Sequence, residues 1–148
     1  GSPKLGEREE AYVAHARELG LEVAVARAAR TDYEGGGLSA SLLLADPARV
    51  EGVFCVNDLM AFGLMDYARN MLGLSIPADL SVIGFDDVPE AHWGAYRLTT
   101  FQQNAQVLAS EIVRVLEKRL EAPATPPIVA VLDLPLVMRD TVRAVAAG

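Results

Sequence analysis

Residues 79–93 read DLSVIGFDDVPEAHW, and this stretch decides how the fold is interpreted. An apolar run ends in two carboxylates, Asp86 and Asp87, and His92 and Trp93 follow shortly afterwards. The run has the length and composition of a buried strand. One aspartate is enough to form the turn after a strand. The second carboxylate raises the question of whether this strand end is only a turn or also a binding site.

The segments before this stretch alternate between strand and helix patterns. GVFCVN, 52–57, predicts a strand buried on both faces. The helical pattern of 58–72 follows directly, with Asp58 well placed to cap it. Successive strands start about 28 residues apart, with one helix in each gap. This alternation is typical of an α/β protein with a parallel sheet flanked by helices and right-handed crossovers.

The remaining segments fit the same alternation of helices and strands. Apolar spacing predicts helices and extended segments along the rest of the chain. The last extended segment is expected to form one or two strands broken near Pro135. The predicted helices cover 7–19, 38–45 and 104–121, and the extended segments cover 21–26, 98–101 and 128–142.

Composition argues against several classes of protein. The chain has 148 residues, 51% of them hydrophobic, which suffices for one domain with a core. Its net charge of -7 disfavours unaided binding of nucleic acid, because phosphate neutralisation needs clustered Lys and Arg. Cys55 is the single cysteine, so no disulfide or Cys-based metal site forms within one chain. We expect a cytoplasmic protein, since neither a membrane span nor a signal peptide is recognisable.

Polar side chains follow two of the predicted strands: Asn57 with Asp58, and Asp86 with Asp87. Both pairs should reach the carboxyl edge of a parallel sheet, where ligands bind. An amide and a carboxylate together suit vicinal hydroxyls, as on a sugar. Arg8, near the start of the first helix, is expected at the same edge. The structural alternative is that Asp58 caps its helix, one later aspartate forms a turn, and Arg8 is solvated.

Several catalytic and cofactor-binding motifs are missing. There is no GxGxxG, P-loop or GxSxG motif, and the spacing of 35–37, GGG, fits no phosphate-binding pattern. We therefore expect no cofactor and no enzymatic activity. Two alternatives stay open: a small α/β enzyme that uses Asp86 and His92, and a metal site that adds Asp87 to these two side chains.

The central region resembles LacI/GalR-type bacterial transcriptional regulators. The resemblance rests on NDLMAFG at 57–63, GLSIPADLSVIGFDD at 73–87 and LTT at 98–100. LPLVMRDT at 134–141 is similar to the end of the family's core. Arg8 matches the arginine that opens the family's first effector-domain helix, although this chain departs from the family pattern nearby, with alanine in place of a glycine.

This resemblance implies an N-terminal helix-turn-helix joined to a two-lobed, periplasmic-binding-protein-like core with a small ligand between the lobes. Residues 1–101 would form the C-terminal lobe. Residues 102–127 would be the crossover segment, with a helix that packs toward the N-terminal lobe, and 128–148 the return strand and tail. The DNA-binding helices, most of the N-terminal lobe and the strand before the first helix would lie outside this sequence.

The resemblance also implies which residues contact the ligand. Asp86 would be a ligand acceptor and Asp87 its structural neighbour. An aromatic side chain that stacks on the ligand would come from 31–33. The expected ligand contacts are Arg8, Asn57, Asp86, Gln103 and Tyr33.

We therefore expect the effector-sensing and dimerisation part of a repressor that binds a sugar-like or nucleobase-like metabolite. Operator DNA would be contacted only through the absent N-terminal domain. A periplasmic-type sugar-binding protein of the same fold is the alternative. A homodimer is expected because helix 58–72 carries apolar residues in several directions, although Trp93 could instead fold onto its own core. The expected interface residues are Leu59, Phe62, Trp93 and Tyr96.

Overall fold

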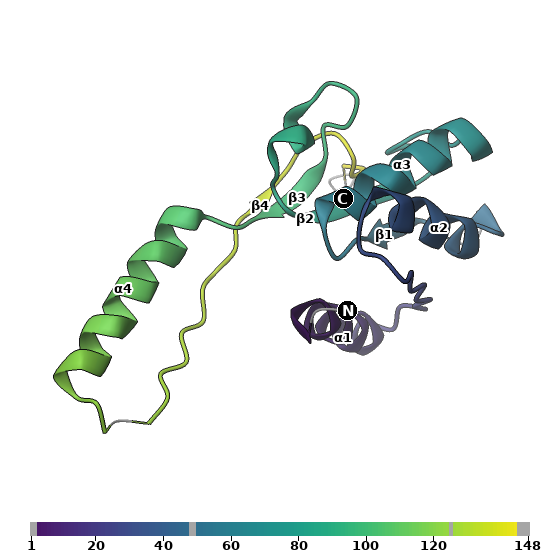
Figure 1. Ribbon diagram of the computed structural model, residues 1–148. Coiled ribbons are helices and arrows are strands. Elements are labelled where there is room, and N and C mark those ends of the chain that lie inside the picture. Colours follow the sequence, from purple (N-terminus) through teal and green to yellow (C-terminus); the bar gives the residue numbers. More distant parts are fainter. Residues whose placement is uncertain (1–2, 48–49, 125, 145–148) are drawn as a thin grey trace.

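The computed structural model describes residues 3–47, 50–124 and 126–144 (Figure 1). The chain begins with two helices and continues with strands and helices in alternation. In order, the elements are α1 (Pro3–Glu18), α2 (Tyr33–Leu43), β1 (Gly52–Phe54), α3 (Asp58–Leu72), β2 (Ser81–Asp86), the 3-10 turn η2 (Pro89–His92), β3 (Thr99–Gln102), α4 (Ala105–Glu121) and β4 (Leu136–Val137).

The four strands form one sheet in the order β1-β2-β3-β4. β1 is parallel to β2, and β2 is parallel to β3 with Gly84 opposite Thr100. β4 is antiparallel to β3, with Val137 opposite Thr100. The predicted α/β fold with a mainly parallel sheet flanked by helices is therefore confirmed. The carboxyl ends of β1 and β2 meet at one edge, as the alternation predicted.

Helix α3 connects β1 to β2 and has clear signals at both ends. Asn57 caps it, since its side-chain oxygen accepts a hydrogen bond from the backbone N–H of Met60 at 2.8 Å. The prediction that Asp58 is the cap was therefore wrong by one residue. The helix stops at Gly73, whose φ of 66° is readily adopted by glycine.

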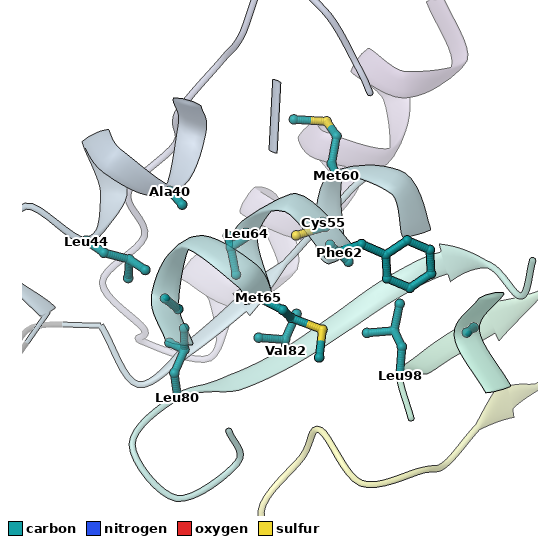
Figure 2. Close-up of a cluster of buried hydrophobic side chains, with 13 residues drawn as sticks. Ala40, Leu44, Cys55, Met60, Phe62, Leu64, Met65, Leu80, Val82 and Leu98 are labelled. Carbon is teal, nitrogen blue, oxygen red and sulfur yellow. The ribbon is translucent and has the colours of Figure 1, made fainter. Parts of the chain in front are cut away.

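The hydrophobic core surrounds α3 (Figure 2). Leu44 closes the core from the α2 side, and Leu80, Val82 and Leu98 close it from the sheet side. Most apolar side chains of α3 pack into this core; Phe62 and Met65, for example, are 3% and 0% exposed. The apolar residues on several faces of this helix are thus mostly buried within the chain. They therefore support a dimer less strongly than the sequence indicated.

Helix α2 lies unusually close to α3 because glycines occupy the contact. A Cβ atom at Gly36 would lie 2.1 Å from the carbonyl oxygen of Met60. One at Gly63 would lie 1.9 Å from the carbonyl oxygen of Tyr33. The glycine at 36 thus serves the packing of α2 on α3, whereas a Cβ atom at Gly35 would lie 1.9 Å from the carbonyl oxygen of Arg30, in the loop before α2.

Three predicted segments differ from the structure. Residues 21–26 form no strand, because a strand needs a neighbouring backbone to pair with and the described ranges offer none there. Helix α2 starts at Tyr33 rather than at residue 38, since Asp32 caps it by accepting from the Gly35 N–H at 2.9 Å. Within 128–142, only Leu136–Val137 pairs as a strand.

Helix α4 projects away from the sheet, and the segment after it runs back to β4 (Figure 1). None of its residues is buried, and its apolar side chains are exposed, with Ile112 at 51% and Leu116 at 57%. Packing of this helix toward a second lobe, and the division of the chain at 101 and 127, stay predictions. In the ranges described, no helix has the length and apolar character needed to cross a membrane.

Candidate functional site

Asp86 is the last residue of β2, and its carboxylate is the centre of a polar cluster at the sheet edge. Its Oδ1 accepts a hydrogen bond from the side-chain amide of Gln103 at 2.5 Å and lies 3.8 Å from Arg8 Nη1. Its Oδ2 has no hydrogen-bond partner in the described part of the chain. The side chain is about one third exposed, at 32%. One carboxylate oxygen is therefore fixed and the other is available to a ligand.

Arg8 reaches this cluster from α1. Its Nη1 donates to the carbonyl oxygen of Val56 at 2.9 Å, directly after β1. Its guanidinium lies 3.6 Å from the ring centroid of Phe85, a cation–π contact. These two contacts fix the side chain so that it presents positive charge beside Asp86. The structure thus brings together Arg8 of α1, Asp86 of β2 and Gln103 of the loop between β3 and α4.

The turn that carries Asp86 is strained. Asp86 has φ 128° and Asp87 has φ 56°. Residues other than glycine rarely adopt such positive φ angles. Each such residue costs about 1–3 kcal/mol and persists only where the surroundings impose it. Strain of this kind is concentrated at ligand-binding sites, which makes the turn a functional candidate in its own right.

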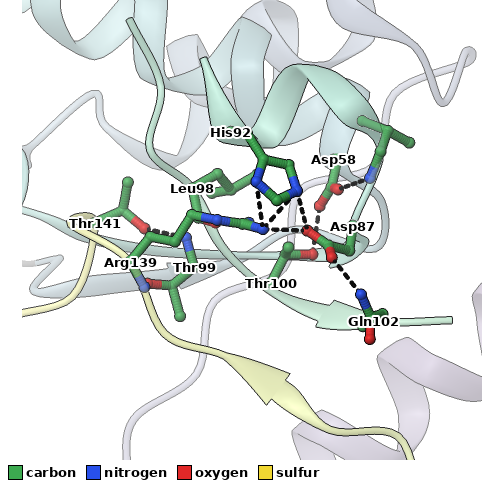
Figure 3. Close-up of polar contacts among 10 residues, drawn as sticks. Asp58, Asp87, His92, Leu98, Thr99, Thr100, Gln102, Arg139 and Thr141 are labelled. Atoms are coloured by element: carbon green, nitrogen blue, oxygen red, sulfur yellow. Dashed lines mark hydrogen bonds and ion pairs between the residues drawn. The ribbon is translucent and has the colours of Figure 1, made fainter. Parts of the chain in front are cut away.

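Asp87 is held by three side chains from other segments (Figure 3). Its Oδ1 accepts from Arg139 at 2.6 Å, and its Oδ2 accepts from Gln102 at 2.8 Å. Asp87 and Arg139 form a buried ion pair, with side chains 3% and 5% exposed. His92 lies against the same pair, with Nε2 at 3.0 Å from Arg139 and 3.7 Å from Asp87. Asp87 therefore supports the turn instead of facing a ligand.

Sequence reasoning did not assign Arg139 or Gln102 to this site. The one available signal was the run LPLVMRDT, which was matched to the family without a role for its arginine. The structure also weakens the enzyme alternative. His92 contacts an arginine and a carboxylate, and within the described ranges no serine or cysteine contacts it to act as a nucleophile.

Asn57 lies at the same edge, and both ends of its amide are engaged. Its oxygen caps α3, and its nitrogen donates to the carbonyl oxygen of Thr31 at 2.8 Å. An amide has two N–H donors and two acceptor lone pairs, so one of each is still available. Asn57 therefore both organises the loop before α2 and can contribute to a ligand contact.

Asp58 is fully buried, at 0% exposed. Burial raises the pKa of its carboxyl above the ordinary 3.8, and the nearby charges of Asp86 and Asp87 act in the same direction. Hydrogen bonds from Thr100 and from the backbone of Val88 oppose that shift. Asp58 is thus neither the helix cap expected from sequence nor a group that a ligand can reach.

Tyr33 does not join the cluster. Its hydroxyl donates to Asp66 in α3 at 2.8 Å, and Tyr96 donates to the same oxygen at 2.9 Å. The expected stacking of Tyr33 on a ligand finds no support in this geometry. The ring of Tyr96 also stacks on Phe62, with centroids 4.2 Å apart.

The residues expected at a dimer interface fall into two groups. Leu59 and Trp93 are 46% and 56% exposed, so a partner could cover them. Phe62 is buried beneath Tyr96, so its side chain lies inside the chain rather than on a surface.

Cavities near the cluster are small. The hollow beside Gln103, between the start of α4 and 132–134, has a volume of about 50 Å³. Ligand pockets typically measure about 300–1,000 Å³. The cluster therefore lies on an open face of the described chain and not in an enclosed pocket. Within the described ranges, no group of three or more His, Cys, Asp or Glu side chains could hold a metal ion.

Comparisons with known proteins agree with this geometry. A family described as periplasmic binding protein-like domain matches residues 2–142. The HTH-type transcriptional repressor CytR of Escherichia coli (strain K12) is 31% identical over 139 residues, which cover 93% of this chain and 40% of the repressor. The ribose operon repressor of Haemophilus influenzae is 34% identical over 111 residues, 75% of this chain and 33% of that repressor.

A solved structure gives the same result. The LacI family transcriptional regulator from Arthrobacter sp. FB24, in complex with lactose, matches with a TM-score of 0.79 at 25% identity, over 90% of this chain and 50% of that one. This chain spans less than half the length of the curated relatives it matches. Those relatives are transcriptional repressors and not enzymes. The chain belongs to the periplasmic binding protein-like domain family, in the form that LacI/GalR-type transcriptional regulators carry.

Proposed function

We propose that this chain is the C-terminal effector-binding lobe of a cytoplasmic, LacI-type regulator that senses a sugar or sugar derivative. The observation that carries the proposal is the carboxylate of Asp86 at the end of β2. One of its oxygens is held by Gln103 and faces Arg8, and the other accepts no hydrogen bond in the described part of the chain. A fixed carboxylate beside a fixed guanidinium suits the hydroxyl groups of a sugar.

The relatives support a sugar over a nucleobase. The ribose operon repressor is named for a sugar, and the Arthrobacter regulator is in complex with one. The absence of a large cavity beside Gln103 fits a ligand that is enclosed only when a second lobe covers this face. Effector binding would then alter operator binding by an N-terminal helix-turn-helix outside this sequence.

Titration calorimetry with the complete gene product that carries this chain tests the proposal. Ribose, lactose and related sugars are injected into wild-type protein and into Asp86→Ala. Loss of a charged acceptor costs about 1.5–3 kcal/mol, so affinity should fall roughly ten- to hundredfold. Asp140→Ala is the matched control, since Asp140 is an exposed carboxylate paired with Arg97 at 3.1 Å, outside the cluster. Equal affinity in wild type and Asp86→Ala would refute the site.

A periplasmic-type binding protein would share this face but not the response of DNA. The measurement that separates the two is binding of operator DNA in a mobility-shift assay with and without sugar. A regulator binds operator DNA, and the amount that it binds changes when sugar is added. A binding protein retains no DNA under either condition.

We further propose that the protein forms a homodimer through Leu59 and Trp93. Both side chains are large, apolar and about half exposed. Sedimentation of the complete gene product should give a dimer mass, and Trp93→Glu should shift it toward the monomer. Leu42→Glu, at a position on α2 that is 66% exposed, is the control. A wild-type monomer at micromolar concentration would refute this interface.

A further inference from the structure

The buried carboxylate of Asp58 lies beside the strained turn and contacts the chain on both sides of it (Figure 3). Its Oδ2 accepts from the backbone N–H of Val88 at 3.0 Å, directly after the turn. Its Oδ1 accepts from the hydroxyl of Thr100 at 2.6 Å. Thr100 pairs with Gly84, two residues before Asp86. A single side chain from α3 thus connects the segment before the turn with the segment after it.

The sequence leaves room for this carboxylate at Gly84. A Cβ atom there would lie 2.2 Å from Asp58 Oδ1 and 2.8 Å from the Leu98 side chain. The carboxylate therefore rests directly against β2. Glycine is required at this point because any side chain would displace Asp58 from its two donors.

Core packing does not explain a charge at this position. No arginine or lysine in the described ranges forms an ion pair with Asp58, and the group is fully buried. A buried carboxylate without a cation costs stability, and a neutral residue of the same size is often tolerated better. Both side-chain hydrogen bonds that offset this cost lead to the turn or to the neighbouring strand.

We propose that Asp58 is a positioning residue for effector binding, which holds the Asp86–Asp87 turn so that Asp86 presents its free oxygen to the ligand. Asp58 does not touch the ligand itself. Its hydrogen bond to Val88 fixes the backbone after two residues with positive φ. Its hydrogen bond to Thr100 fixes the turn relative to β3, which leads to Gln103. The inference rests on the proposed function for the ligand, but the geometry of the turn is independent of it.

The first test uses the ligand-free protein. Asn is isosteric with Asp but has one carbonyl oxygen, so Asp58→Asn can no longer accept from Val88 and Thr100 through two separate oxygens. The turn should loosen, and the hydrogen bond from Gln103 to Asp86 should weaken. With ¹⁵N-glutamine labelling of the complete gene product, the side-chain amide resonances of Gln103 should shift in Asp58→Asn and not in the control Asp140→Asn. Unchanged Gln103 resonances would overturn the proposal.

The second test separates positioning from a purely structural role. Whichever of ribose or lactose binds wild type is titrated into Asp58→Asn, and thermal unfolding is measured in parallel. We expect affinity to fall at least tenfold while the melting temperature stays within a few degrees of wild type or rises, because a buried charge is removed. A lower melting temperature with unchanged affinity would overturn the proposal.

Thr100 provides an independent arm if Asp58→Asn does not fold. Thr100→Val keeps the shape but removes the hydroxyl that donates to Asp58, and Thr100→Ser keeps the hydroxyl. The valine variant should shift the Gln103 resonances and the serine variant should restore them. Identical spectra for both would overturn the proposal. If neither sugar binds wild type while the resonances still shift, the proposed effector class fails and the positioning role of Asp58 stands.

Discussion

Replacing neighbouring glycines of α2 should have opposite effects on stability. Gly36 and Gly37 are adjacent in the helix, and Gly36 lies much closer to the backbone of α3 than Gly37 does. A Cβ atom at Gly36 would lie 2.1 Å from the carbonyl oxygen of Met60, whereas one at Gly37 has its nearest neighbour at 3.8 Å. Cβ atoms essentially never approach other atoms closer than 3.0 Å, so Gly36→Ala forces the two helices apart.

The magnitude follows from two opposing terms. Alanine stabilises a helix by about 1 kcal/mol relative to glycine. Overpacking costs about 1–3 kcal/mol, and the upper end applies because the contacted oxygen belongs to the backbone of another helix. Gly36→Ala should therefore lose about 2 kcal/mol, and Gly37→Ala should gain up to about 1 kcal/mol. At about 2–4 °C per kcal/mol, the melting temperature falls by about 4–8 °C in the first variant and rises by about 2–4 °C in the second.

Circular dichroism at 222 nm during a thermal scan measures both variants against wild type. Gly36→Ala should also weaken the hydrogen bond from Asn57 to Thr31, since that contact spans the loop before α2 and the start of α3. Equal melting temperatures for the two variants would refute the close approach of α2 and α3.

Three further predictions follow from buried polar groups. Arg139→Met leaves Asp87 as an unpaired buried charge, so the free energy of unfolding from urea titration should fall by about 3–5 kcal/mol; a loss below about 1 kcal/mol would contradict this. Burial raises the pKa of the Cys55 thiol to about 12, so iodoacetamide at pH 8 should modify it only when urea is present. The pKa of Asp58 in the folded protein is raised above the ordinary value of 3.8. The contribution of Asp58 to the free energy of unfolding is therefore complete below pH 3.8 and is lost as the pH rises through the pKa of the folded protein. The stability of wild type relative to Asp58→Asn should decline over that window, and a flat difference would contradict the shift.

Most of the sheet could be predicted because its signals are local. Residues 58–72 were predicted as a helix with the observed bounds, since apolar residues at helical spacing lie between the expected cap Asp58 and Gly73, although the observed cap is Asn57. The strand before Asp86 was predicted by its apolar run and its length. The segment 21–26 has equally good strand composition but forms no strand. Strand formation depends on a partner that composition does not reveal.

The site was predicted in part for the same reason. Asp86 was identified because a carboxylate at a strand end is visible in sequence. The resemblance supplied Gln103 and the match of Arg8, and the structure places both beside that carboxylate. The roles of Arg139 and Asp58 were not predicted, because their partners lie 52 and 30 or more residues away. Their positions depend on the pairing of β4 with β3 and on the packing of α3 against β2.

A crystal structure of the complete gene product with its bound sugar tests the central claim most directly. We predict a sugar hydroxyl within about 2.5–3.2 Å of the free oxygen of Asp86, with a second hydroxyl in reach of the Arg8 guanidinium. Gln103 should keep its hydrogen bond to the other oxygen of Asp86. A sugar bound elsewhere, with Asp86 still contacted only by Gln103 and Arg8, would contradict the assignment of this strand end as the effector site.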